Sequence, residues 1–132
     1  MTFVDTNVLL DLLKGDADWA VWSERRLRAA AAQGPLLATD VVFAELCVGA
    51  PSLEEVERFL GSIGVSATPC PGPGLFLAAK AFLDYRRRGG LRTGVLPDFF
   101  IGAHAAIVGA PLLTRDPRRY RTYFPTLELI AP

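Results

Sequence analysis

The chain has 132 residues, of which 51% are hydrophobic, and its formal net charge is zero; its mean hydropathy is +0.28. This length fits a single domain with one core. No apolar run approaches a membrane span and the first residues form neither a signal nor a transit peptide, so we expect a cytoplasmic protein with no membrane partner. Zero net charge excludes a protein that binds nucleic acid over its whole surface.

The first half of the chain alternates short apolar strands with helical patterns. A strand ends at Asp5, and apolar residues at core spacing, Leu12 and Leu13 among them, predict a helix after it. A capping box opening at Ser52 predicts the start of a later helix. Up to residue 68 the pattern predicts helices over 7–14, 16–33, 40–48 with Thr39 as N-cap, and 52–61, and strands over 36–38 and, at an edge, 65–68.

The second half continues the same alternation. It predicts helices over 75–88, 97–108 and 118–123, and strands over 112–114 and 127–130. Cys47 and Cys70 lack zinc-site spacing, so we expect two reduced and largely buried thiols. Strands that alternate with longer helices predict an α/β fold, in which helices cover both faces of a parallel sheet.

Four acidic residues stand out against their surroundings. Asp5 ends a strand, Asp98 begins a helix and Asp116 follows a strand, whereas Glu45 lies among apolar residues of a helix. Strand ends and the helices that begin there share one edge of a parallel sheet, so the four carboxylates should converge. Hard oxygen ligands without histidine or cysteine suit Mg²⁺ or Mn²⁺, and a divalent ion would relieve the repulsion between clustered carboxylates.

Each acid also has a purely structural interpretation. Asp98 could serve only as an N-cap, and Asp116 only as a turn former before Pro117. Glu45 is harder to explain in that way, because an unpaired glutamate among apolar neighbours is unfavourable.

Four sequence segments, taken in order, resemble the successive motifs of PIN domains. The segments are FVDTNVLL at 3–10, Glu45-Leu46 with Gly49, PDFFIGAHA at 97–105, and LTRD at 113–116. More narrowly, the chain is similar to VapC toxins, the small PIN-domain ribonucleases of type II toxin–antitoxin systems. The resemblance implies one PIN domain over 1–132, folded as a three-layer α/β/α sandwich with a central parallel five-stranded sheet. Tyr120 and Phe124 stand where the family often has one phenylalanine after the fourth acid.

The same resemblance implies which residues act and on what. Asp5, Glu45, Asp98 and Asp116 carry over as the acidic metal site, for one or two Mg²⁺ or Mn²⁺ ions, and Thr6, Asn7 and Thr114 match the family's polar supporting positions. The implied activity is hydrolysis of RNA phosphodiester bonds, with the metal activating the attacking water. A cognate VapB-like antitoxin and a homodimer are also implied, and Trp19 and Trp22 are candidates for a groove that binds a partner helix.

Two arginine clusters flank these motifs. Arg115, Arg118 and Arg119, with Arg121 nearby, could hold RNA phosphates beside the acids. The other cluster, residues 86–88 with Arg92, suits the C-terminal end of a helix. His104 lies about 240° around the helix from Asp98, which favours a core or surface imidazole over a catalytic one.

Three other classes of protein remain as alternatives. A receiver domain needs paired acids after the first strand and a lysine on the last, and both are absent. A haloacid-dehalogenase-like phosphatase needs an acid two residues after Asp5, where Asn7 stands. A non-catalytic PIN scaffold that acts as a binding module predicts the loss of some acids, whereas all four are present.

Overall fold

A computed structural model describes residues 1–91 and 94–132, so Arg92, predicted to belong to the arginine cluster with residues 86–88, lies outside the described residues. The elements are β1 (Thr2–Val4), α1 (Thr6–Lys14), α2 (Ala20–Gln33), β2 (Leu36–Thr39), α3 (Asp40–Val48), α4 (Leu53–Ser62), β3 (Val65–Thr68), α5 (Gly72–Arg87), α6 (Leu96–Val108), β4 (Leu112–Leu113), α7 (Arg118–Tyr123) and β5 (Leu129–Ile130).

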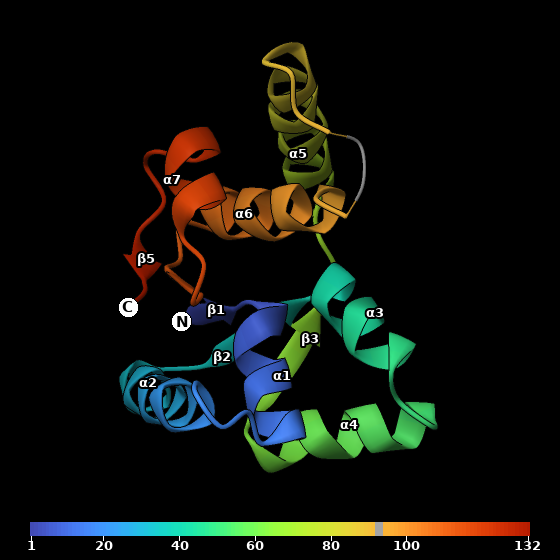
Figure 1. The fold of residues 1–132 in the computed structure, drawn as a ribbon, viewed down its shortest axis with the longest axis vertical. Coiled ribbons are helices and arrows are strands. Elements are labelled where there is room, and N and C mark those ends of the chain that lie inside the picture. Colours follow the sequence, from blue (N-terminus) through green and yellow to red (C-terminus); the bar gives the residue numbers. More distant parts are fainter. Residues whose placement is uncertain (92–93) are drawn as a thin grey trace.

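The five strands form one parallel sheet in the order β3-β2-β1-β4-β5. The central strand β1 pairs with β2 and with β4, and Phe3 lies in register with Leu37 on one side and Leu112 on the other. Helices α1, α2 and α4 lie on one side of the sheet, and α6 and α7 lie on the other, while α5 projects beyond α6 (Figure 1). The predicted α/β/α sandwich with a five-stranded parallel sheet is therefore confirmed, including the edge position of β3.

The core is built from residues of the central strands and of the helices packed on them. Phe3 and Val4 of β1 are almost fully buried, as are Leu9 of α1, Phe99 of α6 and Leu113 of β4. A parallel sheet covered on both faces needs continuous apolar strands, which is what β1 and β4 supply. The carboxyl end of β1 is thereby fixed in the middle of the sheet edge.

Helix starts differ from the sequence prediction at three places. Helix α2 begins at Ala20 rather than Asp16, because the Asp16 carboxylate accepts the backbone N–H groups of Asp18 and Trp19, both at 2.9 Å, and forms a turn. Helix α5 begins three residues early, at Gly72. Helix α6 begins at Leu96 with Val95 as its N-cap, so the interpretation of Asp98 as an N-cap is wrong and Asp98 lies in the first turn.

Two predicted caps have different outcomes. The Ser52 hydroxyl accepts the backbone N–H of Glu55 at 3.3 Å, which confirms the N-terminal cap of α4. Thr39 occupies the N-cap position of α3, but its hydroxyl makes no capping bond and contacts His104 instead.

On α1, the expectation that Leu13 is a core residue is wrong, because 49% of it is exposed, whereas Asp11 is buried.

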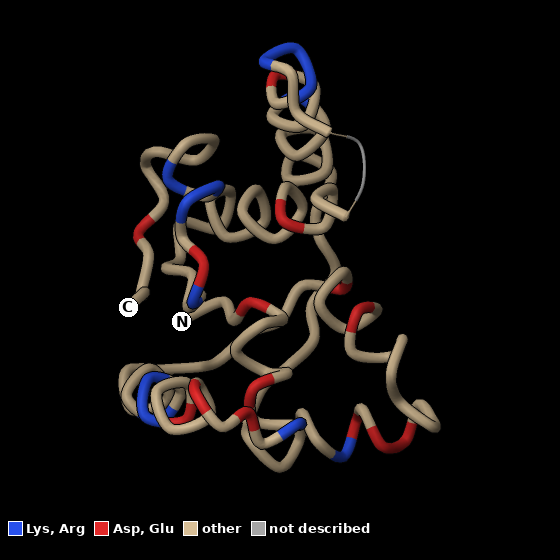
Figure 2. Tube along the Cα trace, viewed as in Figure 1, with Lys and Arg blue, Asp and Glu red and all other residues tan. Residues whose placement is uncertain are grey.

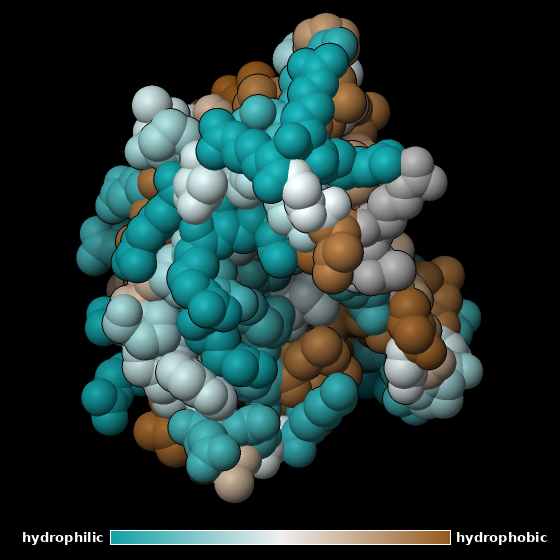
Figure 3. All heavy atoms as spheres, turned by 45° about the horizontal axis from the view of Figure 1, so that its top comes forward, coloured by the Kyte–Doolittle hydropathy of each residue, from teal (hydrophilic) through white to brown (hydrophobic). Residues whose placement is uncertain are grey.

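Charged positions lie on several elements. Basic positions occur at α7, at the tip of α5 and on α2, and acidic positions near the starts of α1 and α6, on α3 and on α4 (Figure 2). Hydrophilic residues cover most of the face in Figure 3, interrupted by separate hydrophobic patches. Within residues 1–91 and 94–132, none of the helices combines the length and the apolar character that crossing a bilayer requires.

Candidate functional site

Asp5 is the buried centre of the site, at the end of β1. Only 5% of the residue is exposed, and its Oδ2 accepts hydrogen bonds from the hydroxyls of Thr114 at 2.7 Å and Tyr120 at 3.0 Å. Burial raises the pKa of Asp5 from 3.8 to about 6, the bonds from Thr114 and Tyr120 oppose that rise, and repulsion by Asp98 adds to it. The Asp5 carboxylate at the end of β1 therefore accepts hydrogen bonds from uncharged groups, and among residues 1–91 and 94–132 it forms no ion pair.

Glu45 reaches the same region from α3. The Thr6 hydroxyl donates to its Oε1 at 2.7 Å, across 39 residues of sequence, and the side chain is half-buried. Burial raises the pKa of Glu45, the bond from Thr6 lowers it, and the charge of Asp98 raises it again. Glu45 is thus paired by a hydroxyl and repelled by a neighbouring acid.

Asp98 is affected by the charges of the other acids and is paired with a cation. Arg119 of α7 donates to Asp98 Oδ2, and both side chains are 32% exposed. Burial raises the pKa of Asp98, the Arg119 guanidinium lowers it, and the charge of Asp116 raises it. In this structure a guanidinium group therefore partly neutralises the acid cluster.

Asp116 stands at the rim rather than in the centre. Its side chain is 61% exposed and forms an ion pair with Arg118 at 3.4 Å. Asp98 and Asp116 line one open cavity of about 430 Å³, together with Arg118, Arg119 and Tyr123. The structure thus places Asp98 near enough to Asp5 and to Glu45 for its charge to raise their pKa, while Asp116, whose charge raises the pKa of Asp98, lies at the mouth.

The three predicted supporting residues all contact the acids or the loop that carries them. Thr6 bonds Glu45, and Thr114 bonds Asp5, as described above. The Asn7 amide donates to Asp5 Oδ2 at 3.3 Å and to Thr114 Oγ1 at 3.4 Å, and its oxygen accepts the backbone N–H of Arg115 at 3.3 Å. Thr114 Oγ1 also accepts the N–H of Asp116 at 3.1 Å. These bonds tie the segment after β4 to the start of α1.

The three predicted phosphate-binding arginines are placed differently. Arg118 pairs with Asp116 and Arg119 with Asp98, so both face the acids themselves. Arg115 points the other way, toward α1 and α2, where its Nε donates to Asp11 Oδ2 at 2.9 Å. Two of the three guanidinium groups therefore pair with acids of the site, and the third pairs with Asp11 of α1.

Three residues of the site were not assigned a role from sequence. Tyr120 donates to Asp5, and Ser23 donates to Asp11, which in turn accepts from Arg115. For Asp11 the sequence held one signal of a place in the site: it lies four residues after Asn7 and therefore on the same face of the helix.

The remaining candidates play structural roles. His104 is 2% exposed and its Nδ1 lies 2.7 Å from Thr39 Oγ1, which confirms a core imidazole. Trp19 and Trp22 pack edge to face, with ring centroids 5.7 Å apart, and neither lines the apolar cavity between α1, α2 and α4. That these tryptophans form part of a groove for a partner helix stays a prediction.

The donor set suits a hard divalent cation, although the carboxylates are not arranged around one point. Within residues 1–91 and 94–132, no three histidine, cysteine, aspartate or glutamate side chains converge in a metal-binding geometry. Asp5, Glu45 and Asp98 nevertheless offer only oxygen ligands, and burial raises the pKa of all three. A cation would lower the free energy of their ionised forms, so the residues fit Mg²⁺ or Mn²⁺ chemically.

The fold and the acidic edge define the class of the protein. The PIN domain family model matches residues 2–125, and the chain therefore belongs to the PIN domain family. No sequence among curated proteins matches the chain.

Solved toxin–antitoxin complexes have the same fold. The chain is similar to VapBC2 from Rickettsia felis bound to a promoter DNA fragment, with a TM-score of 0.76, 18% identity, and coverage of 99% of this chain and 98% of that one. It is also similar to VapBC-1 from nontypeable Haemophilus influenzae (TM-score 0.73, 17% identity, 98% and 96% covered). FitAcB from Neisseria gonorrhoeae gives a TM-score of 0.65, 16% identity, and 98% and 96% covered.

Proposed function

We propose that this protein is the toxin of a VapBC-like toxin–antitoxin pair and acts as a Mg²⁺- or Mn²⁺-dependent endoribonuclease, with residues 1–132 as one PIN domain. The observation that carries the proposal is that, in a PIN fold, Asp5 at the end of the central strand and Glu45 of α3 both lie near enough to Asp98 for its charge to raise their pKa. Similarity to structures described as VapBC and FitAB complexes supports the toxin assignment.

The acids would hold the ion, and the ion when bound would activate water and offset charge on the phosphate oxygens. Asp5 is oriented for this by Thr114 and Tyr120, and Glu45 by Thr6. Asp98 would also hold the ion, and Arg119, its present partner, would then be available to bind a phosphate oxygen. Asp116 at the rim would complete the acidic set, and Arg118 would be available in the same way.

The experiment is cleavage of a long RNA transcript made in vitro. Wild-type protein should cut it with Mg²⁺ or Mn²⁺ and not in excess chelator. Asp5→Asn should remove the activity, because a neutral amide is a poor ligand for a hard cation. Cleavage that persists in chelator would overturn the metal mechanism, and cleavage of no RNA under any metal condition would overturn the nuclease assignment.

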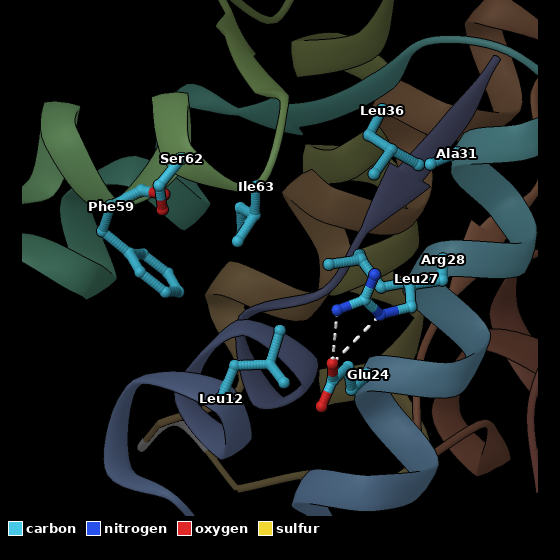
Figure 4. A pocket seen from close by; sticks show the side chains of 9 residues that line it. All are labelled: Leu12, Glu24, Leu27, Arg28, Ala31, Leu36, Phe59, Ser62 and Ile63. Carbon is cyan, nitrogen blue, oxygen red and sulfur yellow. Dashed lines mark hydrogen bonds and ion pairs between the residues drawn. The ribbon is translucent and has the colours of Figure 1, made fainter.

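We propose that an apolar helix of the antitoxin binds between α1, α2 and α4. A cavity of about 430 Å³ there is lined by Leu12, Leu27, Leu36, Phe59 and Ile63, with the Glu24–Arg28 ion pair at its side (Figure 4). A second cavity of about 230 Å³ shares Phe59 and includes Leu13, which is 49% exposed. The toxin should be recovered as a soluble complex when co-expressed with the product of a short open reading frame immediately upstream.

Leu13→Glu tests the location of that surface. The variant should lose the antitoxin in co-purification, since it places a charge in an apolar contact. It should keep metal-dependent RNA cleavage, because Leu13 lies on the half-exposed side of α1. Retention of the antitoxin by the variant would place the partner elsewhere.

A homodimer through α5 is part of the same proposal. Helix α5 projects from the body of the protein, and its residues Leu75, Phe76 and Leu83 are 43%, 65% and 40% exposed (Figure 1). A second copy would bury this apolar side. Light scattering should report a dimer for the wild type and a monomer for Phe76→Glu, and an unchanged mass for the variant would exclude this interface.

A further inference from the structure

Helix α1 carries a second buried carboxylate that lies outside the acid cluster. Asp11 is 2% exposed, and its Oδ2 accepts the Ser23 hydroxyl at 2.7 Å and the Arg115 Nε at 2.9 Å. A buried carboxylate is strongly unfavourable without such partners. Arg115 is therefore the counter-ion of Asp11, and a sequence separation of 104 residues is bridged by this pair.

The Arg115 guanidinium is held on a second side by an aromatic ring. Its Cζ lies 5.4 Å from the centroid of the Trp19 ring, within the range of a cation–π contact. Its backbone N–H donates to Asn7 Oδ1 at 3.3 Å, so both ends of the residue are attached to α1. The side chain is held by two neighbours, Asp11 and Trp19, and the backbone by a third, Asn7.

The Arg115 terminal nitrogens remain available. Among residues 1–91 and 94–132, neither Nη1 nor Nη2 of Arg115 has a hydrogen-bond partner, and the side chain is 32% exposed. Arg118 and Arg119, by contrast, already bind acids of the cluster. Arg115 is thus an arginine whose orientation is set by the protein and whose fork of donors faces solvent.

We propose that Arg115 binds a backbone phosphate of the RNA strand on the α1–α2 side of the acids, and that Asp11 is the positioning residue that orients it. This proposal rests on the proposed ribonuclease function and goes beyond it by assigning one phosphate contact and its support. A guanidinium fork matches a phosphate in a bidentate way, and fixing its rotamer beforehand reduces the entropy lost on binding.

The position fits a strand that passes over the acid cluster. Asp11 lies six residues beyond Asp5, about 9 Å along the helix. Arg115 is joined to the cluster through Thr114, which bonds Asp5 directly. With Arg119 on the α7 side, guanidinium groups would then contact phosphates on both sides of the scissile bond.

The first test compares Asp11→Asn with Glu57→Gln, which removes a carboxylate exposed on α4. Both variants gain one unit of positive charge, so electrostatics alone predicts slightly tighter RNA binding for both. The positioning role predicts the opposite for Asp11→Asn, with the dissociation constant raised about tenfold, the factor for one charge-assisted hydrogen bond. Binding is measured by fluorescence anisotropy of labelled oligouridylate in chelator, so that no cleavage is needed.

The second test keeps net charge unchanged and protects the fold. In Asp11→Asn/Arg115→Met the buried carboxylate and its counter-ion are removed together, and Glu57→Gln/Arg58→Met on α4 is the matched control. The slope of log affinity against log salt should fall by about 0.7 for the first double variant, as expected for one lost phosphate contact with a single strand. It should not change for the control.

The outcomes separate this proposal from the proposed function. Tighter binding by Asp11→Asn, or an unchanged salt slope in its double variant, would overturn the Arg115 contact even if the wild type cleaves RNA. A wild type that binds oligouridylate with this pattern but cleaves no RNA would leave the contact intact and overturn the nuclease assignment. Arg115→Lys should keep the salt slope and still bind more weakly, because an ammonium group cannot form the fork.

Discussion

Replacing Asp5 by asparagine should change how stability depends on pH in the metal-free protein. Burial raises the pKa of Asp5 from 3.8 to about 6, so the folded state holds this proton more tightly than the unfolded chain. Stability contributed by the protonated carboxyl is fully present below pH 3.8 and is lost as pH rises through about 6. An asparagine does not titrate, so the stability of Asp5→Asn does not include this decrease as pH rises.

The magnitude follows from the interval between the two pKa values. At about 1.36 kcal/mol per pKa unit, the ionised Asp5 carboxylate destabilises the folded state by about 3 kcal/mol at neutral pH. The free energy of unfolding of Asp5→Asn, minus that of the wild type, should therefore rise by about 3 kcal/mol between about pH 4 and pH 7.

The assay is urea denaturation in chelator at several pH values, for wild type, Asp5→Asn and Glu57→Gln. Glu57 is the control because its carboxylate is exposed on α4. Added Mg²⁺ should stabilise the wild type more at neutral pH than at pH 5, and Asp5→Asn much less. A difference between Asp5→Asn and wild type that stays flat with pH would refute the conclusion that Asp5 is strained by burial.

Three further substitutions test the surroundings of Asp5. Asp98→Asn should abolish RNA cleavage. It should change the unfolding free energy in chelator by less than about 1 kcal/mol, because relief of the repulsion between the acids offsets the lost ion pair with Arg119. A larger change in urea denaturation would contradict this. Tyr120→Phe removes a hydrogen-bond donor to Asp5 and should increase the stability lost as pH rises, measured by the same urea denaturation series. Gly102→Ala should destabilise by about 1–3 kcal/mol in urea, because its Cβ would lie 2.6 Å from the Phe124 ring; an unchanged midpoint would show that the ring moves freely.

The sheet and the acid positions could be predicted from sequence because each depends on local patterns. Apolar runs broken by turn residues identify strands, and an acid directly after such a run must lie at the strand's carboxyl end. Glu45 was identifiable because its neighbours are apolar. The partners of these acids were not identifiable, since the Asp98–Arg119 pair depends on how α7 packs on α6.

Asp11 shows where local reasoning fails. Helical spacing assigned Leu13 to the core and gave no role to Asp11, whereas the structure exposes Leu13 and buries Asp11. A buried acid is stable only with partners, and these come from α2 and from a segment 104 residues away. No local pattern records such a pair, because it forms only when β4 pairs with β1.

The two buried aspartates at α1 differ in one respect that bears on function. Asp11 has its counter-ion within the protein, in the form of Arg115, and needs nothing further. Asp5 is surrounded by the hydroxyls of Thr114 and Tyr120 and the amide of Asn7, which are all uncharged. Among residues 1–91 and 94–132, the fold provides an arginine for the Asp11 carboxylate and neutral hydrogen-bond donors for the Asp5 carboxylate. A cation from outside the chain would stabilise the ionised Asp5 further, which is the property that the proposed metal-dependent nuclease requires.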